Sequence, residues 1–394
     1  MKPAILVLTS TYPRWANDPD PGFVHELCRR LAPDYEVHVL APHCRGAQRR
    51  ETMDAVHVHR FRYFLTSGQQ LAYDGGMLTK LQLRPWLALL LPLFFCAQLF
   101  SAWRLSRRYR VALVHAHWVI PQGLVAWLLG LLRPAPLVVT SHGADVYGLR
   151  GGLASYLKGR VYTAASAVTV VSRAMAEAVG AQVAADKLQV APMGVDLQQR
   201  FVASAPLAGR EGLVFVGRLV EKKGVDVLLR AYAHLARQRA LPGLSIVGDG
   251  PLRPELEGMA RDLGLAQSVT FAGAVPNAQL PQLLNRHAIA VVPSVVAASG
   301  DQEGLGLVTV EAMGCGCAVI ASDLPAIRDV VRDGRNGLLF APADAGALAV
   351  AIERLIDDDA LRCELARQGG EGARRDFDWS GAARRYRELF ATLL

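Results

Sequence analysis

The stretch LVFVGRLVEKKGVDVLLRAY, residues 213–232, changes its residue pattern half-way along. Its first residues, Leu213 to Val216, are all apolar, which is typical of a strand that is buried on both faces of a sheet. Charged residues and glycine follow, and from Val225 apolar residues recur at helical spacing, so that a helix is predicted over Val225–Gln238. A strand, a short polar loop and a helix form the repeating unit of a parallel sheet covered by helices.

The same alternation continues along the whole chain. Strand-like runs occupy residues 4–10, 35–42, 56–64, 112–118, 136–143, 167–172, 212–218, 244–250, 269–273, 289–294 and 318–323. Helix-length segments separate them, which predicts parallel sheets with helices on both faces. The polar, Pro- and Gly-containing stretch Gln198–Gly212 has the composition of a linker.

We therefore predict an α/β protein with two doubly wound Rossmann-like parallel-sheet domains, residues 1–203 and 204–379. A helix over residues 380–394 is expected to pack back on the first domain. Folds of this kind bind ligands at the carboxyl ends of their strands. Two such edges are expected to face each other across a cleft.

Composition limits the possible partners of the chain. Of its 394 residues, 52% are hydrophobic and 20% are charged, as in globular proteins, and the net charge is +8. The excess of positive charge lies in the first half, which predicts an anionic partner such as nucleic acid, a membrane surface or an acidic substrate. No nucleic-acid motif is present, so nucleic acid is not expected. Six cysteines without paired spacing fit a reducing cytosol, and a strand-like run directly after Met1 leaves no export signal to expect.

One long apolar segment challenges a purely soluble interpretation. Residues Pro85–Trp103 carry no charge and lie between Arg84 and a group of four arginines, Arg104, Arg107, Arg108 and Arg110. The segment could be a buried domain helix, a helix lying on a membrane surface, or a membrane span. A span would place residues 1–84 and 111–394 on opposite sides of the membrane, although both segments supply strands. Tryptophan at both ends and basic flanks favour the interfacial helix.

Two cations follow the first strand of the second domain. Arg218 comes directly after Gly217 at the strand end, and Lys223 comes just before the helix that begins near Gly224. Free backbone N–H groups at a helix start, together with cations, are suited to binding a diphosphate. The alternative is that both are solvated loop charges.

A second stretch, DQEGLGLVTVEAMGCG over Asp301–Gly316, holds two glutamates eight positions apart. A helix is predicted after the strand at residues 289–294, with Gly304 and Gly306 at its start. Eight helical residues span about 12 Å, whereas paired carboxylates in glycoside hydrolases lie roughly 5–9.5 Å apart. Glu303 and Glu311 are better spaced to hold two hydroxyl-bearing groups with a phosphate bridge between them, as in a nucleotide sugar. The alternative is a solvated loop charge and an exposed helix residue.

The sequence GRLVEKKG (217–224) followed by the Glu-x7-Glu spacing closely resembles the retaining GT-B glycosyltransferases of family GT4. Three segments of the first half, TYPRWANDPDPGFVHELCRRLA (11–32), VHAHWVIPQG (114–123) and SHGADVYG (141–148), resemble acceptor-domain segments of bacterial members that build surface polysaccharides. The resemblance covers essentially the whole chain. The chain departs from the family pattern where VVAASGDQ (295–302) lengthens the link between the strand and Glu303. It departs also at Cys317, where proline is usual, and at Asp329, where glutamate is common.

The resemblance implies a role for each matching residue. Arg218 and Lys223 would neutralise the donor diphosphate, Glu303 would face the transferred sugar, and Glu311 would hydrogen-bond the ribose. His142 would point at the sugar and the reacting centre. His142, Glu303, Arg218 and Lys223 are therefore the expected catalytic residues.

The remaining donor contacts are implied in the same way. Gly217 would lie beside the diphosphate, and Gly22 would leave room for it from the first domain. Gly248 and Asp249 would line the nucleobase pocket. The backbone at the start of the second-domain helix would meet the phosphates; its residues are Gly304, Leu305, Gly306 and Leu307.

The implied activity is transfer of a sugar, with retention, from a nucleotide diphosphate sugar to an acceptor hydroxyl on a lipid-linked or surface-polysaccharide glycan. No metal and no cofactor are expected, and the site of action is the inner face of the cytoplasmic membrane, with peripheral contact through the first domain. Two alternatives remain open: a sugar-nucleotide epimerase of the same fold, and a non-catalytic protein that binds nucleotide sugars. The pairs His115/His117 and His57/His59 could suggest a metal, but core histidines are the expectation.

Overall fold

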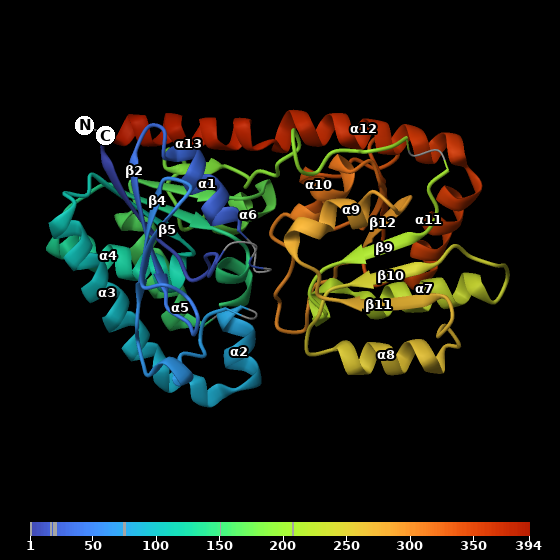
Figure 1. Ribbon diagram of the computed structural model, residues 1–394, viewed down its shortest axis with the longest axis horizontal. Coiled ribbons are helices and arrows are strands. Elements are labelled where there is room, and N and C mark those ends of the chain that lie inside the picture. Colours follow the sequence, from blue (N-terminus) through green and yellow to red (C-terminus); the bar gives the residue numbers. More distant parts are fainter. Residues whose placement is uncertain (1, 16–17, 19–21, 74–75, 150, 207–208) are drawn as a thin grey trace. The chain divides into compact units, whose positions relative to one another are not determined.

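The computed structural model describes residues 2–15, 18, 22–73, 76–149, 151–206 and 209–394 (Figure 1). The chain forms two compact units. The first comprises Met1–Met193 together with Ala382–Leu394, and the second comprises Gly194–Gly381. The second unit therefore begins before the boundary at residue 204 that the linker composition predicts.

The first unit is built on an eight-stranded sheet with the strand order β3-β4-β2-β1-β5-β6-β7-β8. Its strands are β1 (Ala4–Leu8), β2 (Glu36–Pro42), β3 (Arg50–Met53), β4 (Val56–Phe61), β5 (Leu113–His117), β6 (Leu137–Ser141), β7 (Ala167–Val170) and β8 (Leu188–Val190). All neighbours are parallel except β3, which pairs antiparallel with β4. The central strands β1, β5, β6 and β7 are buried throughout, because helices cover both faces.

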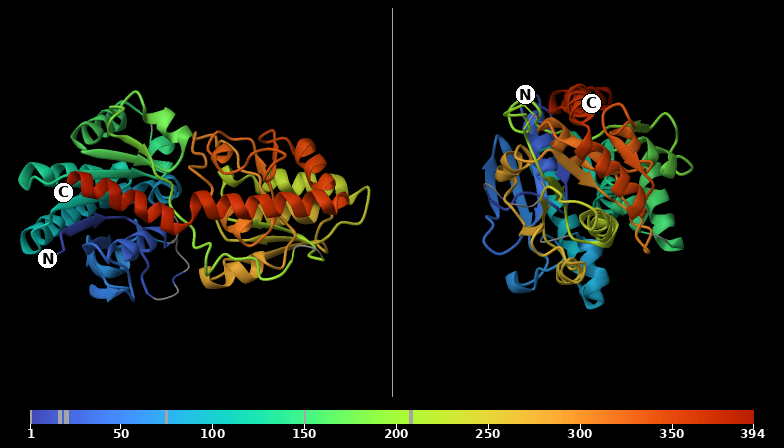
Figure 2. Two further views of the ribbon diagram at one scale, coloured as in Figure 1. Left: turned by 90° about the horizontal axis from the view of Figure 1, so that it is seen from above. Right: turned by 90° about the vertical axis from the view of Figure 1, so that its right-hand side faces the viewer.

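The helices of the first unit follow the strands as a doubly wound fold requires. They are α1 (Phe23–Leu31), α2 (Met77–Leu83), α3 (Leu91–Arg108), α4 (Leu124–Leu132), α5 (Gly152–Ala164) and α6 (Arg173–Val179). The C-terminal helix α13 (Trp379–Leu393) contributes Tyr386, whose hydroxyl lies 3.2 Å from Thr140 Oγ1 and 3.3 Å from Thr169 Oγ1. The last residues of the chain, marked C in Figure 2, therefore pack on the first sheet.

The second unit has a six-stranded, fully parallel sheet with the order β11-β10-β9-β12-β13-β14. The strands are β9 (Leu213–Val216), β10 (Leu244–Val247), β11 (Val269–Gly273), β12 (Ile289–Val292), β13 (Ala318–Ser322) and β14 (Leu338–Phe340). The helices are α7 (Val225–Ala236), α8 (Arg253–Asp262), α9 (Leu280–Leu284), α10 (Leu307–Gly314), α11 (Ala345–Asp357) and α12 (Asp359–Phe377).

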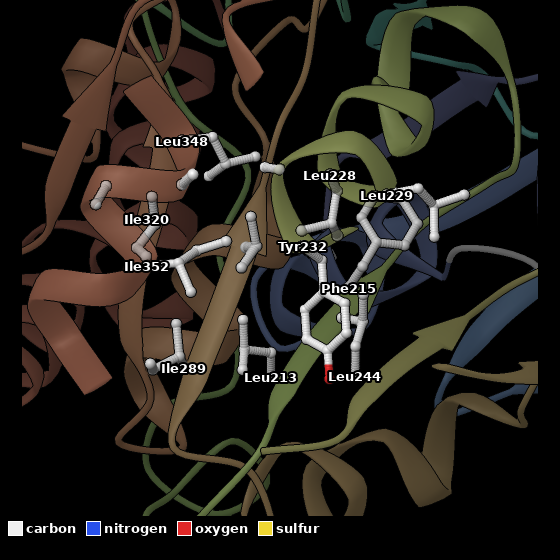
Figure 3. Close-up of a cluster of buried hydrophobic side chains, with 14 of the residues drawn as sticks. Leu213, Phe215, Leu228, Leu229, Tyr232, Leu244, Ile289, Ile320, Leu348 and Ile352 are labelled. Carbon is white, nitrogen blue, oxygen red and sulfur yellow. The ribbon is translucent and has the colours of Figure 1, made fainter. Parts of the chain in front are cut away.

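A single apolar cluster joins two helices to the sheet of the second unit. Figure 3 shows Leu228 and Tyr232 of α7 near Ile352 of α11, above the side chains of Leu213 and Ile289. All five are at least 98% buried. This packing fixes the amino end of α7, which directly follows the predicted diphosphate loop.

The two-domain α/β prediction is confirmed, and every strand-like run of the sequence contains a strand. Three strands had no prediction, namely β3, β8 and β14, which have four, three and three residues. They lie at the edges of the sheets. β3 and β8 have half-buried or exposed residues only, so neither shows the continuous apolar run of a central strand.

The long apolar segment forms the short 3-10 helix η2 (Pro85–Leu90) followed by α3. Only a narrow stripe of α3 is buried, made of Phe94, Gln98, Ala102 and Ser106 at intervals of four residues. Among the described residues, Pro85–Arg108 is the one helical segment long and apolar enough to cross a membrane. However, β1 and β5, on either side of this segment in the chain, pair directly at Ile5↔Leu113. One crossing helix cannot separate two paired strands, so the spanning interpretation is wrong.

Candidate donor and sugar site

The loop after β9 is pressed against the end of β12. Gly224, the residue before α7, has φ +60°, and a Cβ there would lie 1.9 Å from the carbonyl oxygen of Pro293. Only glycine fits such a contact. The close approach places Lys223, the last residue of the 3-10 helix η5 (Glu221–Lys223), beside the residues that follow β12.

Lys223 and Glu303 are brought together by this packing. Lys223 Nζ lies 2.6 Å from Glu303 Oε2, and the two side chains are 15% and 13% exposed. Burial by itself would raise the pKa of Glu303, but the charges of Lys223 and Lys222 and the hydrogen bonds from Lys223 and Ser294 lower that pKa below its usual value. Glu303 therefore stays ionised at neutral pH.

The helix that carries Glu311 begins later than the sequence predicts. α10 starts at Leu307, after Gly306 in the left-handed region at φ +78°, so Glu303 to Gly306 are not helical. The 12 Å separation expected from helical rise therefore does not apply to Glu303 and Glu311. A Cβ on Gly306 would lie 2.9 Å from Ile327 Cδ1, which explains the glycine. No side chain of the described residues caps α10, so its first N–H groups can meet an anion.

Glu311 lies in the second turn of α10 and is half-buried. Burial raises the pKa of Glu311 to about 7, although the charges of Arg200 and Lys223 act in the opposite direction. Arg200 donates a hydrogen bond to the carbonyl oxygen of Asn277 and is a site residue that the sequence did not indicate. Arg200 is far from Glu311 in the sequence, so no local sequence pattern could indicate that Arg200 belongs to the site.

The raised pKa of Glu311 predicts a pH dependence of stability. The native state holds a proton on Glu311 up to about pH 7, whereas the unfolded chain loses it near the ordinary value of 4.5. The native state thus binds more protons in this window, and the free energy of unfolding should fall as pH rises from about 4.5 to above 7. We expect a fall on the order of 1–2 kcal/mol, after allowance for partial solvent access. Urea titrations at several pH values should show this slope, and Glu311→Gln should lose that part of it.

Gly248 and Asp249 follow β10 beside the end of β9. Gly248 has φ +135°, and a Cβ there would lie 1.9 Å from the carbonyl oxygen of Gly217. The exposed carboxylate of Asp249 accepts from the Gly250 N–H at 2.7 Å and from Arg253 Nη1 at 3.3 Å. The structure thus brings Gly217, Gly248 and Asp249 together at the carboxyl ends of the neighbouring strands β9 and β10. Arg218, the next residue after Gly217, is exposed at the same strand end.

In the first unit, Gly22 lies directly before α1, and His142 lies directly after β6. Gly22 precedes α1 with an ordinary φ of −90°, and among the described residues a Cβ there would meet Pro13 alone, at 3.8 Å. The backbone therefore does not demand glycine at this position. Residues 19–21, which precede it, lie outside the described residues.

His142 belongs to a cluster of aromatic and imidazole rings. Its Nε2 lies 2.9 Å from His117 Nδ1, and its ring centroid lies 4.9 Å from that of Phe23 and 4.8 Å from that of Trp118. Burial, with a smaller effect from His115, lowers the pKa of His142 to about 3. His142 is therefore neutral at pH 7. With Nε2 used by His117, its Nδ1 is the ring nitrogen left for another partner.

Asp145 holds the loop of His142 in place and was not singled out from the sequence. Its buried carboxylate accepts three backbone N–H groups, from Val119 at 2.9 Å, His142 at 3.0 Å and Gly143 at 3.1 Å. Burial raises the pKa of Asp145, and its hydrogen bonds from the backbone of Val119 and His142 and from the side chain of Ser141 lower it again in part. The ends of β5 and β6 are thereby tied together.

The histidine pairs lie inside the first sheet. His115 and His117 on β5 are fully buried, and His115 Nε2 lies 2.7 Å from Thr140 Oγ1. His57 and His59 on β4 lie beside His38 of β2, with the His38 and His57 rings stacked at 5.0 Å. Among the described residues, no group of three or more possible ligands is arranged to hold a metal ion.

Two doubly wound units, with cations and a glutamate at the strand ends of the second, form the arrangement that the resemblance to GT-B glycosyltransferases implies. Residues 23–199 match the description "Glycosyltransferase Family 4", and residues 200–376 match "Glycosyl transferases group 1". The chain belongs to the family 4 glycosyltransferases.

Relatives with assigned activities agree with this assignment. The chain is 33% identical over 273 residues to a GDP-mannose-dependent alpha-(1-6)-phosphatidylinositol monomannoside mannosyltransferase of Mycolicibacterium smegmatis, covering 65% of this chain and 70% of the relative. It is 29% identical over 291 residues to a glycogen synthase of Mycobacterium tuberculosis, covering 71% of this chain and 68% of that protein.

Solved structures share the fold. Sucrose-phosphate synthase from Thermosynechococcus elongatus superposes with a TM-score of 0.79 at 25% identity, covering 99% of this chain and all of that one. HepE of Anabaena, solved in complex with UDP, gives a TM-score of 0.74 at 21% identity, with coverage of 99% and 100%. The protein is therefore an enzyme that transfers a sugar from a nucleotide sugar.

Proposed function

We propose that the enzyme transfers the sugar with retention of anomeric configuration, without a metal, to an acceptor glycan carried on a membrane lipid. The observation that carries the donor half of this proposal is the Lys223–Glu303 ion pair of 2.6 Å, in which Glu303 shortly precedes α10. The packing thus brings a cation from the loop before α7 into contact with an ionised carboxylate that shortly precedes the start of α10.

The leaving diphosphate gains negative charge as the glycosidic bond breaks. Arg218, Lys223 and the first N–H groups of α10 supply positive charge for it, and stabilisation of this kind is the largest single contribution in many enzymes. The acceptor hydroxyl attacks the face from which the diphosphate leaves, and the leaving phosphate takes the hydroxyl proton. One C–O bond breaks, one forms, and no covalent sugar–enzyme intermediate is needed.

The two glutamates have different parts in this proposal. Glu303, which stays ionised, accepts a hydrogen bond from a sugar hydroxyl, and Glu311 accepts one from the ribose. His142 is neutral and hydrogen-bonds the sugar through Nδ1. Gly217, Gly248 and Asp249 lie at the strand ends that would flank the nucleotide.

A thermal-shift panel of UDP-, GDP- and ADP-sugars tests the donor class. A ligand at 100 times its dissociation constant should stabilise the fold by about 2.7 kcal/mol. The best donor is then incubated with a membrane lipid extract, and the released nucleoside diphosphate and glycosylated lipid are measured. Formation of an isomeric nucleotide sugar without an acceptor would instead support an epimerase, and stabilisation without any turnover would support a binding protein.

The membrane part of the proposal is supported by α3 and the residues before it. Leu89, Leu93 and Phe100 are exposed, at 79%, 45% and 58%, and they recur at spacings that place them along one side of the segment. Arg104 and Arg107 continue this side at the carboxyl end of α3 and are exposed. An apolar stripe that ends in arginines fits an interface with anionic lipid, where each basic residue contributes about 1 kcal/mol.

Binding to liposomes tests this surface. The wild type should bind vesicles that contain phosphatidylglycerol, and binding should fall as salt rises. Replacing Leu89, Leu93 and Phe100 together by Ser should reduce binding at least tenfold, because apolar area would no longer enter the lipid. The matched control is Val350→Ser on α11, an exposed apolar residue of the second unit, which should bind as the wild type does. Wild type that ignores anionic vesicles at low salt would contradict the membrane contact.

A further inference from the structure

The lengthened loop between β12 and Glu303 has an ordered conformation of its own. Within it, the Ala297 N–H donates to the Asp301 carbonyl at 2.9 Å, and the Gly300 N–H donates to the Ala297 carbonyl at 2.7 Å. Ala297 is buried, whereas Val296 is exposed. Residues 295–302 therefore form a compact turn that leads directly into Glu303.

Three consecutive side chains of η5 hold this loop. Glu221 Oε1 accepts from the Ala298 N–H at 2.7 Å, Lys222 Nζ lies 3.0 Å from Asp301 Oδ2, and Lys223 Nζ lies 2.6 Å from Glu303 Oε2. The backbone adds one more contact, from the Val295 N–H to the Lys222 carbonyl at 2.8 Å. Contacts are thus distributed along the whole loop.

We infer that Glu221 and Lys222 are positioning residues that set the sugar selectivity of the enzyme, by fixing residues 295–302 and through them the carboxylate of Glu303. This inference rests on the proposed role of Glu303 toward the sugar. Neither Glu221 nor Lys222 is assigned to the donor.

Lys222 and Lys223 have different roles because they pair with different carboxylates. When the donor binds, the ammonium group of Lys223 interacts with the diphosphate as well as with Glu303, so it holds Glu303 in place less firmly. Lys222 is paired with Asp301 rather than directly with Glu303, and this pair is largely shielded, since each side chain is 21% exposed. A partly buried ion pair is costly to break from one side, because the remaining charge loses its partner. The Lys222–Asp301 pair therefore keeps the loop in place while Lys223 binds phosphate.

Selectivity depends on how firmly Glu303 is held. A polar site that is built to hydrogen-bond a given hydroxyl strongly rejects a substrate that lacks it at that place. If the loop moved, Glu303 could follow the hydroxyl of a different sugar, and a misplacement of about 1 Å can lower the rate by a factor of about a hundred. Loosening the loop should thus lower both the rate with the preferred sugar and the preference itself.

The test compares two variants, Asp301→Asn and Glu221→Gln, with the matched control Asp323→Asn, which removes an ion pair with Arg328 elsewhere in the second unit. Donors are the best nucleotide sugar of the thermal-shift panel and its C4 epimer on the same nucleotide. We expect Asp301→Asn to lower kcat/KM with the preferred sugar about tenfold and to lower the ratio between the two sugars at least fivefold. Affinity for the free nucleoside diphosphate, measured by calorimetry, should stay unchanged. Asp323→Asn should behave as the wild type.

A charge exchange gives a second line of evidence. Lys222→Asp combined with Asp301→Lys should recover most of the selectivity that Asp301→Asn loses. Separately, hydrogen exchange should show that the Ala298 amide is protected in the wild type and exchanges faster in Glu221→Gln. Wild-type rate and selectivity in Asp301→Asn would overturn the inference, as would an equal loss of nucleoside diphosphate affinity. Glu303→Gln distinguishes failure of the loop's proposed role from failure of the proposed role of Glu303. If it impairs transfer while Asp301→Asn does not, only the inference fails, and if it leaves transfer intact, the proposed site itself fails.

Discussion

Lys223→Ala is expected to lower kcat/KM by about a hundredfold while leaving the fold intact. Loss of one contact to charge that grows in the transition state costs on the order of 3 kcal/mol. The same change leaves the carboxylate of Glu303, which is 13% exposed, without its direct partner. The pKa of Glu303 should then rise, and the acid limb of the pH–rate profile should move to higher pH.

Arg218→Ala separates these two effects. Arg218 is an exposed residue at the end of β9, and Arg218→Ala leaves the direct Lys223–Glu303 ion pair in place. We expect a similar loss of rate without the shift of the acid limb. Arg230→Ala on α7, an exposed arginine paired with Asp226, is the matched control and should retain wild-type activity. Near-normal turnover in Lys223→Ala would remove the diphosphate assignment, and circular dichroism would show whether a loss of rate reflects unfolding.

Glu303→Gln and Glu311→Gln are expected to fail at different steps. Glu303→Gln should lower kcat by roughly a hundredfold, because the charge that is held beside the sugar is lost, and should spare affinity for the free nucleoside diphosphate. Measured at a pH above the raised pKa of Glu311, about 7, Glu311→Gln should weaken that affinity about tenfold, since a hydrogen bond to a charged acceptor contributes roughly 1.5–3 kcal/mol. Calorimetry with UDP, GDP and ADP measures the nucleoside diphosphate affinity, and steady-state turnover measures kcat. Equal loss of nucleoside diphosphate affinity in both variants would contradict the division between sugar and ribose.

The fold was predictable because its signals are local. The apolar runs at residues 213–216 and 289–292 are buried central strands, and the change to helical spacing at Val225 marks the start of α7. Gly217 and Gly224 lie where the chain must turn between strand and helix, so their positions could be read from the sequence. The short edge strand β3 could not, since its exposed and half-buried residues alternate without a continuous apolar run.

The chemistry of the site was predictable only in its residue types. Glu303 and Lys223 are 80 residues apart, and their contact depends on the close approach of the Gly224 loop to Pro293. The same holds for the pKa of Glu311, which burial raises. Asp145 accepts a hydrogen bond from Val119, which is 26 residues earlier in the chain, and the sequence around Asp145 does not indicate this distant partner.

The burial of individual side chains in the apolar segment was likewise not predictable from the sequence. Composition identified Pro85–Trp103 as apolar with basic flanks, but it could not tell which side chains face the sheet. The sheet side includes the fully buried Phe94 and Gln98, whereas Leu93, next to Phe94, is exposed. Pairing of β1 with β5, which removes the spanning interpretation, is a contact between distant segments.

The central claim is metal-free transfer of a sugar with retention at the site of Lys223 and Glu303. The most direct test follows the anomeric proton by ¹H NMR during turnover of the best donor, with EDTA present and a membrane lipid extract as the source of acceptor. We expect the first product to keep the anomeric configuration of the donor and chelation to leave the rate unchanged. A product of opposite configuration, an isomerised nucleotide sugar, or a rate that vanishes with EDTA and returns with a divalent metal would contradict it.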